Sequence, residues 1–298
     1  MYPSRLSRYL GQAIRQRFKN PSFAPQGQEW LEDGFAALRK SDYQTALQCF
    51  DQAVKTHTTS HAAWYSRGIA LYYSGQDDAA LKAFSRAGRL QPQSHLAWYG
   101  RGMTLAALGH DDEALTAFDH AITLQPQSHL AWLAKGMTLV TLQRWEEAVQ
   151  VFHMTLVRHS HSAYGWYGLG AAYLQAKTYA EALTAFERSL ALQADFDLAW
   201  YGKGLALLQT QRSQDALEAF EAATTANPQS LLAWFHKAEA LTVLERLEEA
   251  GAAYEQVLRL SDASHPLYPQ AQRQIQLLRQ KRAVMDRTVL NAPKEKSV

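Results

Sequence analysis

Hydrophobic residues along this chain recur with a fixed period of 34 residues. Seven of the eight tryptophans mark the period, at Trp30, Trp64, Trp98, Trp132, Trp166, Trp200 and Trp234. Counting each tryptophan as position 4, glycine occupies position 8 in six of the seven units, alanine occupies position 20 in all seven, and phenylalanine occupies position 24 in six. A fixed period of this size is typical of identical supersecondary units stacked in one direction.

Each period predicts two helices. Positions 4, 8 and 11 lie on one stripe of a helix, since steps of three and four residues return to the same face. Position 24 belongs to a second helix that packs back onto the first. Gly75 and Gly109 suit the intervening turn, and acids such as Glu146 suit the positive end of the second helix dipole. Tryptophan is expected to fill the space between the paired helices, where the small residues let the backbones approach.

The pattern resembles the W-x-x-L-G-x-x-Y…A-x-x-x-F…P signature of tetratricopeptide repeat proteins over residues 27–264. The resemblance implies an all-α fold, a right-handed superhelix of helix-turn-helix repeats with terminal capping helices, about sixteen helices in total. The seven repeats are predicted at 27–60, 61–94, 95–128, 129–162, 163–196, 197–230 and 231–264. One departure from the signature is systematic, because position 7 is usually leucine but is basic in five repeats, at Arg67, Arg101, Lys135, Lys203 and Lys237.

The segments that flank the repeats have patterns of their own. Apolar residues at helical spacing in residues 1–26 are Leu6, Tyr9, Leu10, Ile14 and Phe18. This basic segment is predicted to be an amphipathic helix or leader that caps the first repeat. The alternative is a helix that binds an anionic membrane surface through residues 4–19. Residues 265–286 predict a C-terminal capping helix, and residues 287–298 predict a disordered tail.

Composition narrows the class of protein. The chain is 47% hydrophobic, yet it has no apolar run near the length that spans a membrane and no apolar core of a secretory signal near its N-terminus. Cys49 is the only cysteine, so no internal disulfide is expected, which is compatible with a reducing compartment. We therefore expect a cytoplasmic protein, with a location peripheral to a membrane as the alternative.

The net charge of +2 is distributed unevenly. Residues 1–26 contribute five positive charges, residues 265–298 contribute five more, and the repeats between them therefore carry −8. An acidic array offers no continuous basic track for phosphates, so we expect no nucleic-acid partner.

Candidate chemistry is sparse, and we expect no enzyme activity, no cofactor and no metal. His61, His95 and His129 share one repeat position. Stacked repeats separate such residues by roughly 10–20 Å, too far to share one ion. The glycines at Gly165 and Gly168 fall inside a predicted helix rather than after a strand, which excludes a phosphate-binding loop.

The resemblance places ligand binding on positions 2, 5, 9, 12 and 13 of the first helices, which line a concave groove in this family. Here these positions are mainly apolar or aromatic. Position 6, which carries asparagine in grooves that clamp a carboxylate, is small in five repeats, which argues against such a clamp and leaves room for a bulky apolar ligand. The predicted groove residues are Tyr65, Ile69, Tyr72, Leu96, Tyr99, Met103, Leu130, Leu133, Met137, Tyr164, Tyr167, Leu198, Tyr201, Leu205 and Phe235.

An apolar groove of this kind suits an amphipathic helix anchored by side chains one turn apart. We predict a non-catalytic scaffold or assembly factor that holds such a helical segment of a partner protein. Four alternatives stay open: a groove that is closed by its own packing, a peripheral membrane adaptor, a self-associating structural protein, and a groove occupied by the chain's own Leu6–Phe18 segment.

Overall fold

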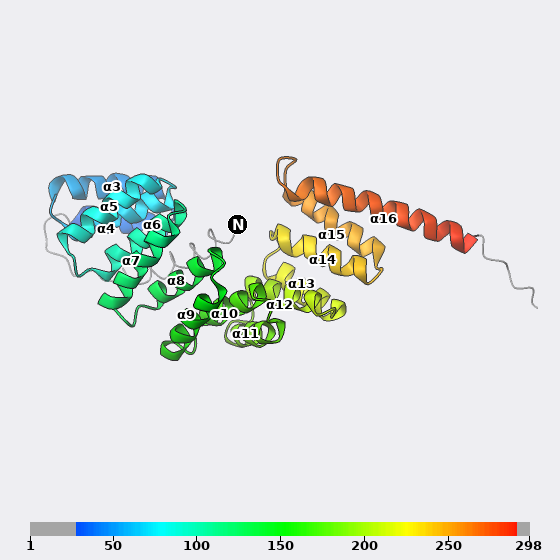
Figure 1. The fold of residues 1–298 in the computed structure, drawn as a ribbon. Helices are drawn as coiled ribbons and strands as arrows, with labels where there is room; N and C mark the ends of the chain where they lie inside the picture. The colour runs from blue at the N-terminus through cyan, green and yellow to red at the C-terminus, as the bar shows by residue number, and fades with distance from the viewer. Residues whose placement is uncertain (1–27, 291–298) are drawn as a thin grey trace, which may run out of the picture. The chain divides into compact units, whose positions relative to one another are not determined.

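The computed structural model describes residues 28–290, which form fifteen α-helices and no strand. The predicted all-α fold is confirmed. Seven consecutive helix pairs run from α2–α3 to α14–α15, and α16 follows them (Figure 1). The predicted N-terminal helix and residues 291–298 lie outside the described residues. The chain divides into two compact units, residues 1–160 (unit 1) and residues 161–298 (unit 2).

Unit 1 contains four helix pairs, α2 (Gln28–Arg39), α3 (Tyr43–Thr56), α4 (His61–Tyr73), α5 (Asp77–Leu90), α6 (His95–Ala107), α7 (Asp111–Leu124), α8 (His129–Thr141) and α9 (Trp145–Arg158). Unit 2 contains three pairs and a final helix, α10 (Ala163–Gln175), α11 (Tyr179–Leu192), α12 (Asp197–Gln209), α13 (Ser213–Ala226), α14 (Leu231–Val243), α15 (Leu247–Leu260) and α16 (Leu267–Leu290). Helix α16 extends four residues beyond its predicted end at residue 286.

The phenylalanine at position 24 forms the core where two repeats meet. The ring of Phe84 on α5 lies between Gly68 of its own repeat and Gly100 of the next repeat. A Cβ atom added to Gly68 or Gly100 would lie 2.8 or 2.5 Å from that ring. In unit 2, Phe186 lies in the same way between Gly170 and Gly202. The small residues therefore admit a phenylalanine ring, which packs two repeats together.

Each helix pair turns through a residue in the left-handed region. Position 15 has a φ between 59° and 78° in all seven repeats, at Ser41, Gly75, Gly109, Gln143, Lys177, Gln211 and Glu245. The residue that follows donates its N–H back across the turn, as from Gln76 to the carbonyl of Leu71 at 2.9 Å. These are the features of a helix C-terminal cap closed by a left-handed residue.

Six of the seven periodic tryptophans are partly buried, and Trp64, Trp98, Trp200 and Trp234 pack against the hydrophobic core. The first, Trp30, is 43% exposed. Where the bond is recorded, the indole N–H donates to the carbonyl at position 32 of the preceding repeat, six residues earlier. The Trp132 bond to Pro126 measures 2.9 Å. The tryptophan thus fixes the linker between two repeats, while phenylalanine fills the core.

The basic residue at position 7 also joins neighbouring repeats. Four of these residues pair with the acid at position 25 of the preceding repeat: Arg67 with Asp51, Lys135 with Asp119, Lys203 with Glu187, and Lys237 with Glu221. The nitrogen–oxygen distances run from 2.5 to 3.2 Å. Several of these cations also lie over the tryptophan ring of their own repeat, as Lys237 does 5.2 Å from Trp234. The departure from leucine therefore has a structural role on the outer side of each unit.

Helix α16 covers the last repeat. Ala271, Ile275 and Leu278 are buried against α15, while the opposite face carries exposed residues such as Gln272 and Gln276. A polar outer face is what a terminal helix needs to end a stack of repeats in water.

Candidate functional site

Seven of the predicted groove residues lie in the core. They are at most 7% exposed and pack against the second helices: Tyr65, Ile69, Tyr99, Leu133, Tyr167, Tyr201 and Phe235. Tyr99, for example, packs against Phe118 at a ring distance of 6.1 Å. Leu130 is also buried, at 9%. Position 5 therefore belongs mainly to the interior of each unit, and a partner reaches it only where a cavity opens.

Position 6 faces the same interior. Ser66, Gly100 and Ala134 are at most 2% exposed or directly against a phenylalanine ring, so their small size serves packing between repeats. The expectation that small residues here make room for a bulky ligand is wrong, because the phenylalanine of the preceding repeat already occupies that space.

The remaining predicted residues are half-buried and, together with three further residues at position 12, form an accessible apolar face in each unit. We call this set the inner stripe. In unit 1 the inner stripe consists of Tyr72, Leu96, Met103, Met137 and Val140; in unit 2 it consists of Tyr164, Leu174, Leu198, Leu205 and Leu208. In α14 the corresponding face is polar, because His236 pairs there with Glu239 at 2.6 Å.

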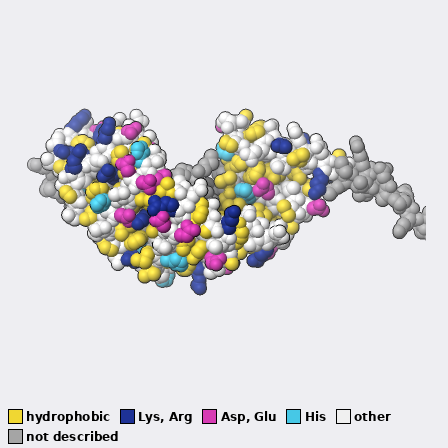
Figure 2. Space-filling view, viewed as in Figure 1, with side chains coloured by type: hydrophobic (Ala, Val, Ile, Leu, Met, Phe, Trp, Pro, Cys, Tyr) yellow, Lys and Arg dark blue, Asp and Glu magenta, His cyan; other side chains and the backbone are white. Residues whose placement is uncertain are grey.

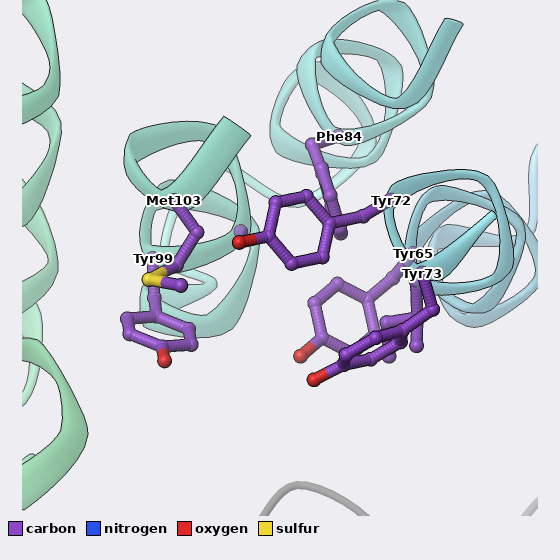
Figure 3. A pocket seen from close by; sticks show the side chains of 8 residues that line it. Tyr65, Tyr72, Tyr73, Phe84, Tyr99 and Met103 are labelled. Atoms are coloured by element: carbon purple, nitrogen blue, oxygen red, sulfur yellow. The ribbon is translucent and has the colours of Figure 1, made fainter. Parts of the chain in front are cut away.

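Unit 1 opens a small apolar cavity at the inner stripe. The cavity has a volume of about 20 Å³ and is lined by residues of α4, α5 and α6. These residues are Tyr65, Ile69, Tyr72, Tyr73, Phe84, Tyr99, Gly100 and Met103. We call its four tyrosines the tyrosine cluster. Figure 3 shows the hydroxyls of Tyr65, Tyr73 and Tyr99 directed to the same side of the pocket, and the ring of Tyr72 extended from α4 toward Met103 on α6.

The hydroxyl of Tyr99 is a buried polar group without a hydrogen-bond partner among the described residues. Its side chain is 1% exposed and lines the cavity. Burial raises the pKa of this phenol well above its usual range, with smaller contributions from the neighbouring tyrosines. Tyr99 is therefore a neutral hydroxyl at the cavity that is able to donate and to accept a hydrogen bond.

Sequence reasoning missed two contributors to this face. Tyr73 stands at position 13, which belongs to the groove set, and stacks on Tyr43 at 5.6 Å. In unit 2, Phe196 replaces the serine that caps the first helix in most repeats. Its buried ring packs on Tyr164 at 4.6 Å and on Tyr167 at 5.1 Å. The signal for Phe196 was available, because an aromatic residue at a helix-capping position implies packing rather than capping.

A second cavity lies between α15 and α16. It has a volume of about 280 Å³ and a mixed rim of Glu248, Glu255, Arg279 and Arg282. Gly251 forms part of it, at a position where the other six repeats carry leucine or valine. A Cβ atom added to Gly251 would meet no atom within 4 Å, so the absence of a side chain there leaves part of this space open.

The face drawn in Figure 2 has mixed charge. Basic and acidic side chains are interspersed across the middle of the view in Figure 2. Within residues 28–290, no three histidine, cysteine or acidic side chains are placed to hold a metal ion. In the same range, no helix combines the length and the hydrophobicity needed to cross a membrane.

The fold and the inner stripe define a helical-repeat protein with an accessible apolar face. The chain belongs to the tetratricopeptide repeat family, whose model matches residues 34–94, 65–129, 133–197 and 201–265. Proteins of this family are typically non-catalytic, and their fold supports protein interaction in general. No curated protein sequence matches the chain.

Solved tetratricopeptide repeat structures resemble the fold at low sequence identity. A protein from Parabacteroides merdae is 15% identical with a TM-score of 0.66, over 86% of this chain and 99% of that one. A chain of the APC/C hetero-tetramer Cut9–Hcn1 is 18% identical with a TM-score of 0.66, over 80% of this chain and 48% of that one. A thermophilic protein from Thermus thermophilus is 23% identical with a TM-score of 0.54, over 61% of this chain and 100% of that one. At these identities the likeness extends to the fold alone.

Proposed function

We propose that this protein is a non-catalytic scaffold or assembly factor that holds an apolar or amphipathic helical segment of a partner protein against its inner stripe. The observation that carries the proposal is the make-up of that stripe. All of its side chains are apolar or aromatic and half-buried in both units. In unit 1 they come from the first helices α4, α6 and α8, and in unit 2 they come from α10 and α12.

Three properties of the stripe favour a helical ligand. Accessible apolar side chains that recur on neighbouring helices offer anchor points for residues spaced one turn apart. On three of these helices the basic residue at position 7 is held in an ion pair with the preceding repeat: Arg67 on α4, Lys135 on α8 and Lys203 on α12. The stripe therefore offers apolar contact and few charges, so an acidic extended peptide gains little there.

The test is capture of partners by full-length tagged protein from lysate, with soluble and membrane fractions kept separate. The variant Met103→Glu/Leu198→Glu places one charge on the stripe of each unit. Both positions are half-buried, so the variant is expected to keep its helicity by circular dichroism.

A matched control carries the same number of new charges on exposed apolar residues of α9. Met154 and Val157 are 43% and 80% exposed, and Met154→Glu/Val157→Glu leaves the stripe intact. We expect the stripe variant to lose its partner by tenfold or more, about 1.4 kcal/mol, while the control keeps it. A partner retained equally by both variants would place the binding surface elsewhere. The fraction that yields the partner distinguishes a cytosolic scaffold from a membrane adaptor.

A further inference from the structure

One hydroxyl of the tyrosine cluster lacks a hydrogen-bond partner among the described residues. The Tyr99 hydroxyl is buried at the cavity with no hydrogen-bond partner among the described residues, although buried polar groups in proteins almost always have one. Tyr72 and Met103, on either side of it, remain half-buried (Figure 3). An occupant that lies over the cavity can supply both the missing hydrogen bond and the missing apolar cover.

The lining limits the chemistry of that occupant. All eight side chains or backbones that line the cavity are uncharged, so no group there neutralises an anion. Tyrosine rings attract cations at their faces, and phenol oxygens accept hydrogen bonds from arginine or lysine. The cavity itself, at about 20 Å³, has room for little more than one small group. The fitting ligand is therefore a segment whose apolar side chains cover the rings and whose neighbouring basic side chain donates a hydrogen bond to the Tyr99 hydroxyl.

Residues 1–26 of this chain have that composition. They combine Leu6, Tyr9, Leu10, Ile14 and Phe18 with five basic residues and contain no acid. They also join the described structure at the start of α2, a helix of unit 1 that contacts α4. The tyrosine cluster on α4 and α6 thus lies one to two repeats from the point of attachment.

The tether makes this segment a strong competitor for the site. A helix of thirteen residues would span about 20 Å, and eight residues reach up to about 26 Å when fully extended, so a chain of this length can reach across one or two repeats. A short linker holds its ligand at an effective concentration of about millimolar, so weak contacts suffice for occupancy.

We propose that residues 1–26 bind in cis over the tyrosine cluster of unit 1 and are displaced when a partner helix binds the inner stripe. This inference rests on the proposed function, because the segment and the partner share one face. The N-terminal segment then competes with the partner for this face, so only a partner that binds more strongly than the tethered segment displaces it.

The test is photo-crosslinking within the full-length chain. Tyr72 is replaced by p-benzoylphenylalanine, the protein is irradiated, and the crosslinked peptides are identified by mass spectrometry. The control carries the same group at Arg89, which is exposed on the second helix α5 of the same unit. We expect position 72 to crosslink within its own chain to residues 1–26, and position 89 to give no such product.

A second comparison tests the contacts assigned to the segment. Leu10→Glu/Ile14→Glu, introduced beside the photoreactive group, should reduce the crosslink about fivefold or more, since it removes two apolar anchors. The control Gln12→Glu/Gln16→Glu adds the same charge at polar positions of the segment, so it should reduce the crosslink less. Equal crosslinking from positions 72 and 89, or equal loss in the two pairs of variants, would overturn the proposal.

Products that join two chains instead of one would also overturn it, in favour of self-association. The two proposals remain separable. If the crosslink is absent and partner capture still depends on Met103 and Leu198, self-occupancy fails while the scaffold function stands. If the crosslink is present and Leu10→Glu/Ile14→Glu protein still captures no partner through the stripe, the scaffold function fails while self-occupancy stands.

Discussion

At the scale of single residues, the same amino acid has opposite roles at different positions. Gly102 faces the ring of Phe118, and a Cβ atom there would lie 2.6 Å from it. Gly251 lies inside α15 with no atom within 4 Å of such a Cβ. The first glycine is required by packing, and the second only weakens its helix.

These two glycines give a matched pair of variants. Gly102→Ala should destabilise the protein by about 1–3 kcal/mol, because the methyl group overpacks the core. Gly251→Ala should stabilise it by roughly 0.5–1 kcal/mol, because alanine favours the helix. Chemical denaturation of the two variants measures both free energies of unfolding. The same sign of change in both would contradict this assignment of the glycines.

The histidine pair of the fourth repeat gives the protein a pH dependence. The rings of His129 and His159 lie 4.8 Å apart. Burial, and then the neighbouring His159, lower the pKa of His129 from 6.5 to about 4. The unfolded chain therefore binds more protons than the folded chain between those values, so stability is full above pH 6.5 and declines as the pH falls toward 4.

Replacing His129 should make the stability of the protein depend less on pH. We expect His129→Gln to lose less stability than the wild type between pH 7 and pH 4.5, as measured by the denaturation midpoint at each pH. Carboxylates titrate in the same window in both proteins, so the difference between them isolates the histidine. Parallel curves for the two proteins would show that His129 titrates normally.

At the scale of the helices, two contacts on the outer side connect consecutive repeats. The indole bond to position 32 fixes the linker, and the ion pair between positions 7 and 25 connects the first helix of one repeat to the second helix of the repeat before it. The basic residues of these pairs are 19–28% exposed and the acids 38–59%, so solvent screens the charges in part. Each pair is therefore expected to contribute modestly.

A double-mutant cycle on Lys135 and Asp119 measures this contribution. We expect a coupling energy of about 0.2–1 kcal/mol from Lys135→Met, Asp119→Asn and the combined variant. Added salt should reduce the coupling, since both side chains reach solvent. A coupling of zero at low salt would mean that this ion pair does not contribute to the free energy of unfolding.

At the scale of the whole molecule, helix α16 ends the stack, and stability in such arrays comes mainly from neighbouring repeats. Ile275 is 8% exposed between α15 and α16. Ile275→Asp buries a carboxylate without a partner and should cost about 2–4 kcal/mol locally. Hydrogen exchange should accelerate in α14, α15 and α16 and stay unchanged in α2 to α7. Uniform acceleration over the chain would instead indicate one cooperative unit.

The fold was predictable from the sequence to the level of individual helices, because the tryptophan and the alanine recur in all seven repeats, as Trp64 and Ala80 do, and the phenylalanine recurs in six, as Phe84 does. The site was predictable only in part. Spacing along a helix shows which side chains share a face, and it placed Tyr65 and Tyr72 together. Spacing does not show which of these side chains the next repeat buries. That depends on how the repeats pack, for example on how closely Gly100 of the next repeat lets its helix approach the ring of Phe84. The ion pairs could have been predicted from the sequence, because each one joins an acid to a basic residue sixteen positions later.

The ion pairs between repeats have a consequence for how such a chain evolves. The repeat 197–230 carries both halves of this contact, because Lys203 pairs with Glu187 of the repeat before it and Glu221 pairs with Lys237 of the repeat after it. An in-frame copy of the gene segment for this repeat, inserted beside the original, would encode a lysine and a glutamate that match both neighbours. Lengthening the array at this repeat therefore requires no new complementary mutation. The repeat 61–94 does not have this property, since it pairs through Arg67 but carries Ser85 at position 25.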